Sequence, residues 1–265
     1  MKKPHNFIRE KKIYCGPKYM EVDVYPYTKN QEDTIKGKRS KKVKETPPKQ
    51  KNMNDKNAKR YLTQLANTNF AENDFHISCT YSKHNLPETL EEAVNIVKNF
   101  LRKIAYRYKK IEEELKYILV TEHSGINKAG NPTRIHHHII INNIGISRDE
   151  IEDLWILKKK KGEKAKRIGF INVDRLQVQD GGLAALCTYL TKDPQGKKRW
   201  STSQNLERPW SRSNDAKYSR RQVIKIATSP PDPKIWATLY PGWELTNIDY
   251  GYEAAYNDIT GWSIY

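Results

Sequence analysis

Three consecutive histidines are the most chemically informative residues of the chain. His136 and His138 flank His137 in the segment RIHHHIII, which spans residues 134–141. Because side chains two apart on a strand share a face, His136 and His138 are expected to project together and His137 to point to the other face. Two imidazoles on one rigid strand suit the binding of a divalent metal ion. The alternative is a solvent-exposed strand, but the isoleucines beside the histidines indicate a buried central one.

A third metal ligand is available at the end of the preceding strand. Glu122 ends the segment YILVTE, and a turn-rich stretch leads back to His136. If the two strands pair, Glu122 lies beside the histidines and completes a site with two histidines, one carboxylate and open positions. An ordinary strand-end carboxylate is the alternative for Glu122. His123 is a weaker candidate, since the pleat directs it to the opposite face.

Tyr189 and Lys192 are the residues that suit nucleophilic chemistry. They stand three apart in a helix expected from Leu183 to about Lys192, so both side chains are expected on one helix face. A tyrosine on an amphipathic helix is usually a packing residue, and only the histidine strand upstream favours a catalytic role. A phenol with a pKa of about 10 is a weak nucleophile at neutral pH and needs an electrophile made more reactive.

The elements that must position these residues follow the order β-α-β-β-α-β-α. Strands are expected at 75–81, 117–123, 134–142 and 167–173, and helices near Pro87, after Ser147 and from Leu183. Capping-box spacing marks two of the helix starts, at Thr89 with Glu92 and at Ser147 with Glu150. The short loops between the central strands predict an α+β fold, with an antiparallel central sheet and helices packed on it.

The balance of charge indicates a polyanionic partner. The 265 residues include 48 Lys and Arg against 31 Asp and Glu, a formal net charge of +17. Such an excess favours binding to nucleic acid or to an acidic membrane surface. The three cysteines form no CxxC pair, which disfavours a disulfide framework and a thiolate zinc site and suits a reducing compartment. Without a long apolar run or a signal peptide, neither a secreted nor an integral-membrane protein is expected.

Composition divides the chain into four expected regions. Residues 1–35 contain a strand or hairpin around Ile13–Tyr27, and residues 36–68 form a basic arm or linker whose composition predicts disorder. The catalytic domain is expected at 69–195. Residues 196–265 are rich in aromatic side chains, include one helix expected at 215–226, and are expected to pack around the catalytic domain.

The ordered motifs resemble those of the HUH endonuclease superfamily, over Asp74–Lys192. Its members have a strand with His-hydrophobic-His and, downstream, a helix with Tyr-x-x-Lys, and replication members have an earlier strand motif that Ser78–Tyr81 resembles. The tyrosine follows the histidines, as in rolling-circle replication initiators of phages, plasmids and mobile elements. Two positions depart from the family pattern. His137 stands where an apolar residue is usual, and Ala185 stands where some members carry a second tyrosine, so this chain resembles the single-tyrosine enzymes.

The resemblance implies a ferredoxin-like or RRM-like core and metal-dependent transesterification of single-stranded origin DNA, in the cytoplasm of a bacterial host. Tyr189 would attack a phosphodiester, leaving a 5′-phosphotyrosine link and a free 3′-hydroxyl for a host polymerase, with a host helicase as a further partner. Mg²⁺ or Mn²⁺ would be held by Glu122, His136 and His138, and no small-molecule cofactor is implied. Lys192 would lower the pKa of the phenol or pair with the phosphate.

The DNA strand is expected to be held by basic side chains, with stacking of bases on Tyr81. The expected phosphate contacts come from the basic arm and from the neighbourhood of the histidine strand: Lys38, Arg39, Lys41, Lys42, Lys128 and Arg134. Binding should therefore weaken steeply with salt. Two alternatives stay open. One is a relaxase or transposase with the same chemistry, which the motif order disfavours. The other is a non-catalytic DNA-binding regulator, which the presence of Tyr189 disfavours.

Overall fold

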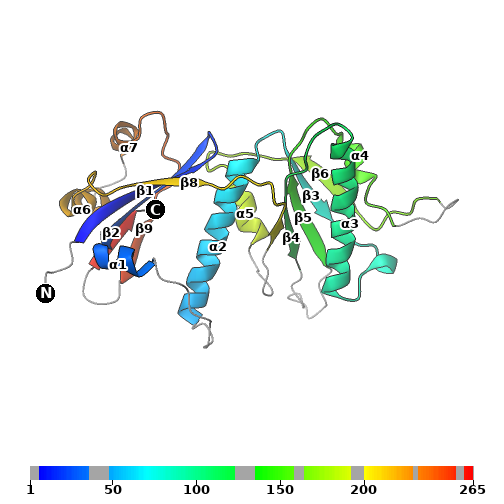
Figure 1. Ribbon diagram of the computed structural model, residues 1–265, viewed down its shortest axis with the longest axis horizontal. Helices are drawn as coiled ribbons and strands as arrows, with labels where there is room; N and C mark the ends of the chain where they lie inside the picture. The colour runs from blue at the N-terminus through cyan, green and yellow to red at the C-terminus, as the bar shows by residue number, and fades with distance from the viewer. Residues whose placement is uncertain are drawn as a thin grey trace. The chain divides into compact units, whose positions relative to one another are not determined.

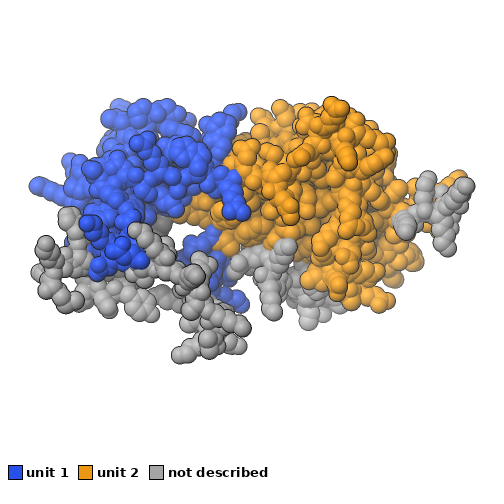
Figure 2. Space-filling model, viewed as in Figure 1, with its two compact units in different colours: residues 1–57, 208–265 blue, residues 58–207 orange. Residues whose placement is uncertain are grey.

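The fold is that of a computed structural model, which describes residues 6–35, 48–122, 135–157, 164–191, 200–228, 232–254 and 260–264. The chain divides into two compact units (Figure 2): unit 1 comprises residues 1–57 and 208–265, and unit 2 comprises residues 58–207. In the ranges described, no helix is both long enough and apolar enough to cross a membrane.

Unit 2 contains, in its described residues, a five-stranded antiparallel sheet in the order β6-β3-β5-β4-β7, with helices on both faces (Figure 1). Its strands are β3 (Phe75–Cys79), β4 (Tyr117–Glu122), β5 (His136–Ile141), β6 (Ile171–Arg175) and β7 (Ser201–Thr202). Its helices are α3 (Leu90–Lys109), α4 (Arg148–Glu152), α5 (Ala184–Leu190), the short 3-10 helix Lys83–Asn85 and most of α2 (Pro48–Asn69). The expected α+β class and the β-α-β-β-α-β-α order are confirmed.

The central position of β5 explains its run of isoleucines. Ile139 and Ile141 are buried in the cluster formed with α3, whereas Ile140 is buried in the cluster formed with α2 and α5 on the opposite face. A strand covered on both faces needs apolar side chains at consecutive positions instead of alternating ones. The histidines therefore occupy the first half of a strand whose second half is fixed in the core.

Both predicted caps lie where helices begin, and the cap at Ser147 forms the complete capping box. The Thr89 side chain accepts a hydrogen bond from the Glu92 backbone N–H at the start of α3, and Glu92 accepts one from the backbone N–H of Glu88. At the start of α4, Ser147 and Glu150 make both bonds of the motif. The buried side chains of α3 follow the 3.6-residue period and face the sheet: Ala93, Val97, Phe100, Leu101, Ile104 and Tyr108.

The prediction of a disordered arm at residues 36–68 is wrong for residues 48–68, because these residues are helical. Residues 36–47 lie outside the described residues, but α2 extends over Pro48–Asn69. Leu62, Leu65 and Ala66 recur at helical spacing and are buried, together with Phe70, against β4, β5 and α5. The burial of this apolar stripe stabilises the helix, although the preceding turns are rich in lysine.

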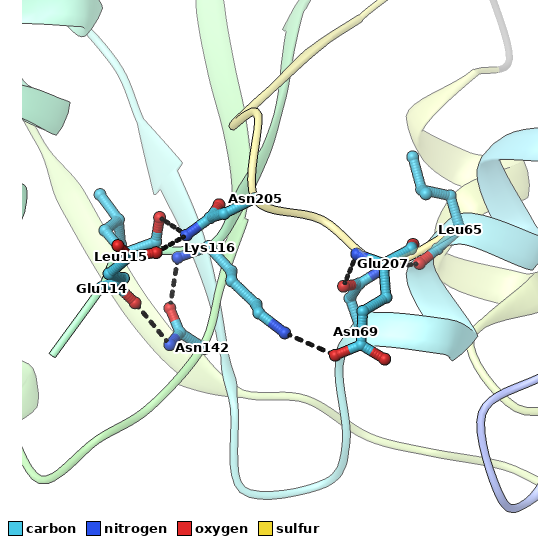
Figure 3. Close-up of polar contacts among 8 residues, drawn as sticks. All are labelled: Leu65, Asn69, Glu114, Leu115, Lys116, Asn142, Asn205 and Glu207. Carbon is cyan, nitrogen blue, oxygen red and sulfur yellow. Dashed lines mark hydrogen bonds and ion pairs between the residues drawn. The ribbon is translucent and has the colours of Figure 1, made fainter. Parts of the chain in front are cut away.

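Unit 2 extends past the expected domain end at residue 195. Strand β7 pairs with β4, and residues Asn205 and Glu207 make polar contacts with other parts of unit 2 (Figure 3). The Asn205 side-chain amide donates to Glu114 Oε2 at 3.0 Å, and the Asn69 side chain both donates to the Glu207 carbonyl and accepts from its N–H, each at 2.8 Å. Lys116 Nζ lies 3.2 Å from Glu207 Oε1. Trp200 and Leu206 add apolar contacts to the cluster beneath α5.

Unit 1 joins the two ends of the chain in a second sheet. Its described strands have the order β8-β1-β2-β10-β9: β1 (Asn6–Cys15), β2 (Tyr19–Thr28), β8 (Trp210–Asn214), β9 (Tyr250–Ala254) and β10 (Thr260–Ile264). The hairpin expected near residues 13–27 is confirmed as β1 and β2. The helices of unit 1 are α1 (Lys29–Ile35), α6 (Arg220–Thr228) and α7 (Pro233–Leu239). The region expected at 196–265 is divided between the two units: residues up to 207 belong to unit 2, whereas residues 208–265 belong to unit 1, where β8 pairs with β1.

An ion pair between part-exposed Lys217 and buried Glu10 links the C-terminal part of unit 1 to its first strand. Glu10 is 3% exposed, and its Oε1 accepts hydrogen bonds of 2.7 Å from Lys217 Nζ and from the Tyr240 hydroxyl. The Tyr240 hydroxyl also lies 2.8 Å from that of Tyr218. A buried carboxylate requires such partners, because its desolvation would otherwise be costly.

Candidate active site

Glu122, His136 and His138 come together at the ends of β4 and β5. The register pairs Glu122 directly with His136, as the strand pattern requires. Glu122 Oε2 lies 3.8 Å from His136 Nε2 and 3.6 Å from His138 Nε2, so both histidines turn the same nitrogen toward one carboxylate oxygen. The side chain of His138 is 8% exposed and that of His136 34%, so the cluster opens toward solvent on the His136 side.

Tyr189 lies next to this cluster. Its ring meets that of His138 edge-to-face, with the ring centres 5.5 Å apart, and the side chain is half exposed. Burial of Leu183, Cys187 and Leu190 fixes the orientation of α5 against the sheet. The sequence analysis expected the tyrosine and the histidines at one site, and the structure places them together.

Helix α2 supports the start of α5. The Asn67 side-chain carbonyl accepts a hydrogen bond of 3.0 Å from the backbone N–H of Leu183, one of the groups that a helix start leaves without an intrahelical partner. Leu62, Leu65 and Ala66 pack against the same helix. The sequence analysis missed this support, although the apolar spacing at 62, 65 and 66 was its signal.

The donor types at Glu122, His136 and His138 fit a divalent cation, since mixed imidazole and carboxylate ligands suit Mn²⁺ and admit Mg²⁺. Adjacent ligand atoms of an octahedral ion with bonds of about 2.1 Å lie about 3 Å apart. The observed separations of 3.6 and 3.8 Å are somewhat wider. Accordingly, no group of three His, Cys, Asp or Glu side chains in the described ranges is already arranged to hold an ion.

His137 points to the opposite face of β5, as the pleat predicts. It is fully buried; its Nε2 lies 2.8 Å from the Tyr81 hydroxyl and its Nδ1 3.0 Å from Thr121 Oγ1. Burial, with a smaller contribution from the flanking histidines, lowers the pKa of His137 to about 3. This histidine is therefore neutral in the folded protein at pH 7, and its hydrogen bonds replace the apolar packing that is usual at this position in the resembled family.

A fourth histidine, which the sequence analysis missed, lies behind His138. His76 Nε2 and Ser78 Oγ, both on β3, are each 3.3 Å from His138 Nδ1. Burial lowers the pKa of His76. The alternation of β3 was the signal: Phe75, Ile77 and Cys79 are buried in the cluster with α3, so residues 76 and 78 must face the histidine pair.

The same alternation corrects the role expected for Tyr81. Its side chain continues the buried row of β3 and is 2% exposed, with its hydroxyl donating to the Ala93 carbonyl at 3.2 Å. A DNA base cannot stack on a ring enclosed in the core, so the expected stacking role of Tyr81 is wrong for this structure. Burial also raises the pKa of the Tyr81 phenol.

Phe170 is the exposed aromatic residue that the sequence analysis missed on this sheet. Its side chain is 69% exposed. The Thr80 N–H donates to the Phe170 carbonyl at 2.8 Å and the Ser82 N–H donates to the Ile168 carbonyl at 3.0 Å, which continues the β3–β6 register past the strand end. Ile171, the first residue of β6, is buried in the cluster with α3, and Phe170 comes directly before it.

Several expected site residues lie outside the described residues. These are Lys192, Arg134, Lys128, His123, Lys38, Arg39, Lys41 and Lys42. The expected helix to about Lys192 ends earlier, at Leu190. The shared helix face expected for Tyr189 and Lys192 therefore stays a prediction.

Comparison with known proteins adds one finding on function. No curated protein and no solved structure matches the chain at the significance required. Residues 74–194, a little under half of the chain, match the family model of the ORF2-type replication-associated proteins. The matched stretch includes Glu122, His136, His138 and Tyr189, and it nearly coincides with the stretch from Asp74 to Lys192 that resembles the HUH endonucleases. This part of the chain is therefore similar to replication-associated proteins of the ORF2 type, which supports a replication initiator protein.

Proposed function

We propose that the chain initiates rolling-circle replication by nicking single-stranded origin DNA with Tyr189. One observation carries the proposal. The ring of Tyr189 lies 5.5 Å from that of His138, and His138 shares a carboxylate oxygen with His136. This arrangement lies within the residues that match a replication-associated family. The family match favours replication over the relaxase and transposase alternatives.

In the proposed reaction, the Tyr189 hydroxyl oxygen attacks the phosphorus of one phosphodiester. A bond forms between the phenolic oxygen and phosphorus, the bond to the 3′-oxygen breaks, and the phenolic proton leaves to solvent while the 3′-oxygen becomes a hydroxyl. The products are a 5′-phosphotyrosine link and a 3′-end that a host polymerase can extend. Exposure of half the Tyr189 side chain leaves room for the approach of a DNA strand.

Glu122, His136 and His138 would hold Mg²⁺ or Mn²⁺ in this proposal. When bound, such an ion polarises the scissile phosphate and stabilises the charge that develops on it. The protein residues fix the position of the donors. Glu122 and His136 are paired across two strands of the sheet, and His138 is anchored by contacts on its far side. Lys192, two residues beyond the end of α5, would supply positive charge to the phosphate.

Phe170 takes the place of Tyr81 as the proposed stacking residue. Its side chain is exposed, and its carbonyl accepts a hydrogen bond from the Thr80 N–H directly after the end of β3. Base stacking on an exposed aromatic ring contributes about 1–3 kcal/mol, and every base offers a suitable face. The phosphate contacts proposed for Lys128, Arg134 and the basic arm complete the DNA interface.

The proposal is tested by cleavage of labelled single-stranded DNA tiled from the replicon that encodes the protein, in Mn²⁺ or in EDTA. His136→Ala and Glu122→Ala are expected to lose cleavage at limiting Mn²⁺. His84→Ala is the matched control, because His84 is exposed in the short helix Lys83–Asn85. Binding of the DNA should persist in all variants and weaken steeply as salt rises.

The possible results separate the proposed function from its rivals. Full cleavage by either site variant would remove that residue from the site. Cleavage that is unaffected by EDTA would exclude the metal role. Tight, salt-sensitive binding without cleavage of any tile would favour a non-catalytic DNA-binding regulator.

A further inference from the structure

The Nδ1 atom of His138, the ring nitrogen that does not face Glu122, has polar contacts of its own. Its Nε2 turns toward Glu122, and its Nδ1 turns toward His76 Nε2 and Ser78 Oγ on β3, each 3.3 Å away. The planes of the His76 and His138 rings are within 11° of parallel. In the register of β3 and β5, Ser78 lies opposite His138, and His76 lies opposite Ile140, two residues further along β5.

The chemistry of imidazole makes these contacts consequential. A neutral histidine carries one ring proton, and the nitrogen without it offers a lone pair. His138 can present the lone pair of Nε2 to a cation only if its proton is on Nδ1. The N–H group at Nδ1 then needs an acceptor, because it is buried with the rest of the ring. In the opposite tautomer Nε2 would carry the proton, which would point at Glu122, and this nitrogen would have no lone pair to offer to a cation.

We propose that His76 is a positioning residue for His138: its Nε2 accepts the Nδ1 proton of His138 and so holds the ring in the tautomer that exposes Nε2 to a metal ion. The inference rests on the metal site of the proposed function. Ser78 Oγ offers a second acceptor for the same proton. Ligating histidines commonly donate their other ring N–H to a partner of this kind, and loss of that partner typically reduces metal affinity about 10- to 100-fold.

A purely structural role for His76 makes a different prediction. If its ring only fills space on the sheet, an apolar side chain of similar size would serve as well. The relevant comparison is therefore between a side chain that can accept a hydrogen bond and one that cannot. His76→Gln keeps an acceptor on a side chain of comparable reach, and His76→Leu removes it.

The experiment measures Mn²⁺ affinity without DNA, from the loss of the electron paramagnetic resonance signal of free Mn²⁺. Wild type, His76→Leu and His76→Gln are compared, with His84→Leu as an exposed-histidine control and His136→Ala as a ligand control. His76→Leu is expected to bind Mn²⁺ about 10- to 100-fold more weakly than wild type. His76→Gln should recover most of that loss, and His84→Leu should equal wild type.

A second measurement needs no variant at all. Nitrogen-15 correlation spectra of wild type at saturating Mg²⁺ are expected to show His138 with its proton on Nδ1. A proton that stays on Nε2 would overturn the proposal. So would unchanged Mn²⁺ affinity in His76→Leu, or equal losses in the Leu and Gln variants. If wild type and His136→Ala bind Mn²⁺ equally well, or neither binds it, the result contradicts the metal site of the proposed function and not the role of His76.

Discussion

The burial of neutral His137 beside the candidate site should make the stability of unit 2 fall in mild acid. Its pKa is lowered to about 3 in the folded protein from an ordinary value of 6.5, chiefly by burial. Between these values the unfolded chain binds a proton at His137 that the folded chain does not. Stability therefore rises with pH across this window and is lost as pH falls from 6.5 toward 3.

The expected magnitude follows from the two pKa values. The slope approaches about 1.4 kcal/mol for each pH unit inside the window. Between pH 7 and pH 5, the titration of His137 alone should lower the free energy of unfolding by about 2 kcal/mol. His137→Leu replaces the imidazole with an apolar side chain, so this variant should lack that part of the pH dependence.

The assay is urea unfolding of wild type and His137→Leu at pH 7 and pH 5, followed by circular dichroism. All other ionisable groups are shared by the two chains, so the difference between their pH dependences isolates His137. Wild type is expected to lose about 2 kcal/mol more than the variant between the two pH values. Equal losses would refute the assignment of His137 as a buried, neutral histidine held between Tyr81 and Thr121.

Three further predictions concern contacts within a single unit, one in unit 1 and two in unit 2. Lys217→Met should destabilise unit 1 by about 3–5 kcal/mol in urea unfolding, because it leaves the buried Glu10 carboxylate without its cation, and a change below about 1 kcal/mol would contradict this. Asn67→Ala should cost about 1 kcal/mol and slow DNA nicking, because it removes the acceptor of the Leu183 N–H under the tyrosine helix; unchanged nicking would separate α2 from the site. Ser147→Ala should cost a similar amount by removing the α4 cap and should leave nicking unchanged, and a loss of nicking would contradict that independence.

Local pattern was sufficient to predict the order of the helices and strands of unit 2 from β3 to α5. Capping boxes marked the starts of α3 and α4, and strand alternation placed His136 and His138 on one face with His137 on the other. The same alternation, read one strand earlier, predicts that Tyr81 is buried, because it continues the row of Phe75, Ile77 and Cys79. The stacking role expected for Tyr81 was wrong because its chemical type was considered without its place in that row.

The missed elements are those without a local signal or with a misleading one. The lysines of α2 resemble a solvated arm, and its apolar stripe occupies only the last turns, around Leu62 and Leu65. All five residues of β8 are exposed, and its partner β1 lies about 200 residues earlier in the chain. No short-range pattern predicts a pairing of that separation, so the composition of unit 1 from both chain ends became visible only in the structure.

The most direct test of the proposed chemistry is the covalent adduct between protein and DNA. Wild type and Tyr189→Phe would be incubated with single-stranded DNA from the replicon and Mn²⁺, separated under denaturing conditions, and the adduct located by peptide mass. The substitution removes one hydroxyl from a half-exposed side chain, so the fold and DNA binding should be retained. We predict an adduct on Tyr189 in wild type that is absent from Tyr189→Phe and from samples with EDTA. An adduct that persists in Tyr189→Phe, or one linked to another residue, would contradict the proposed chemistry.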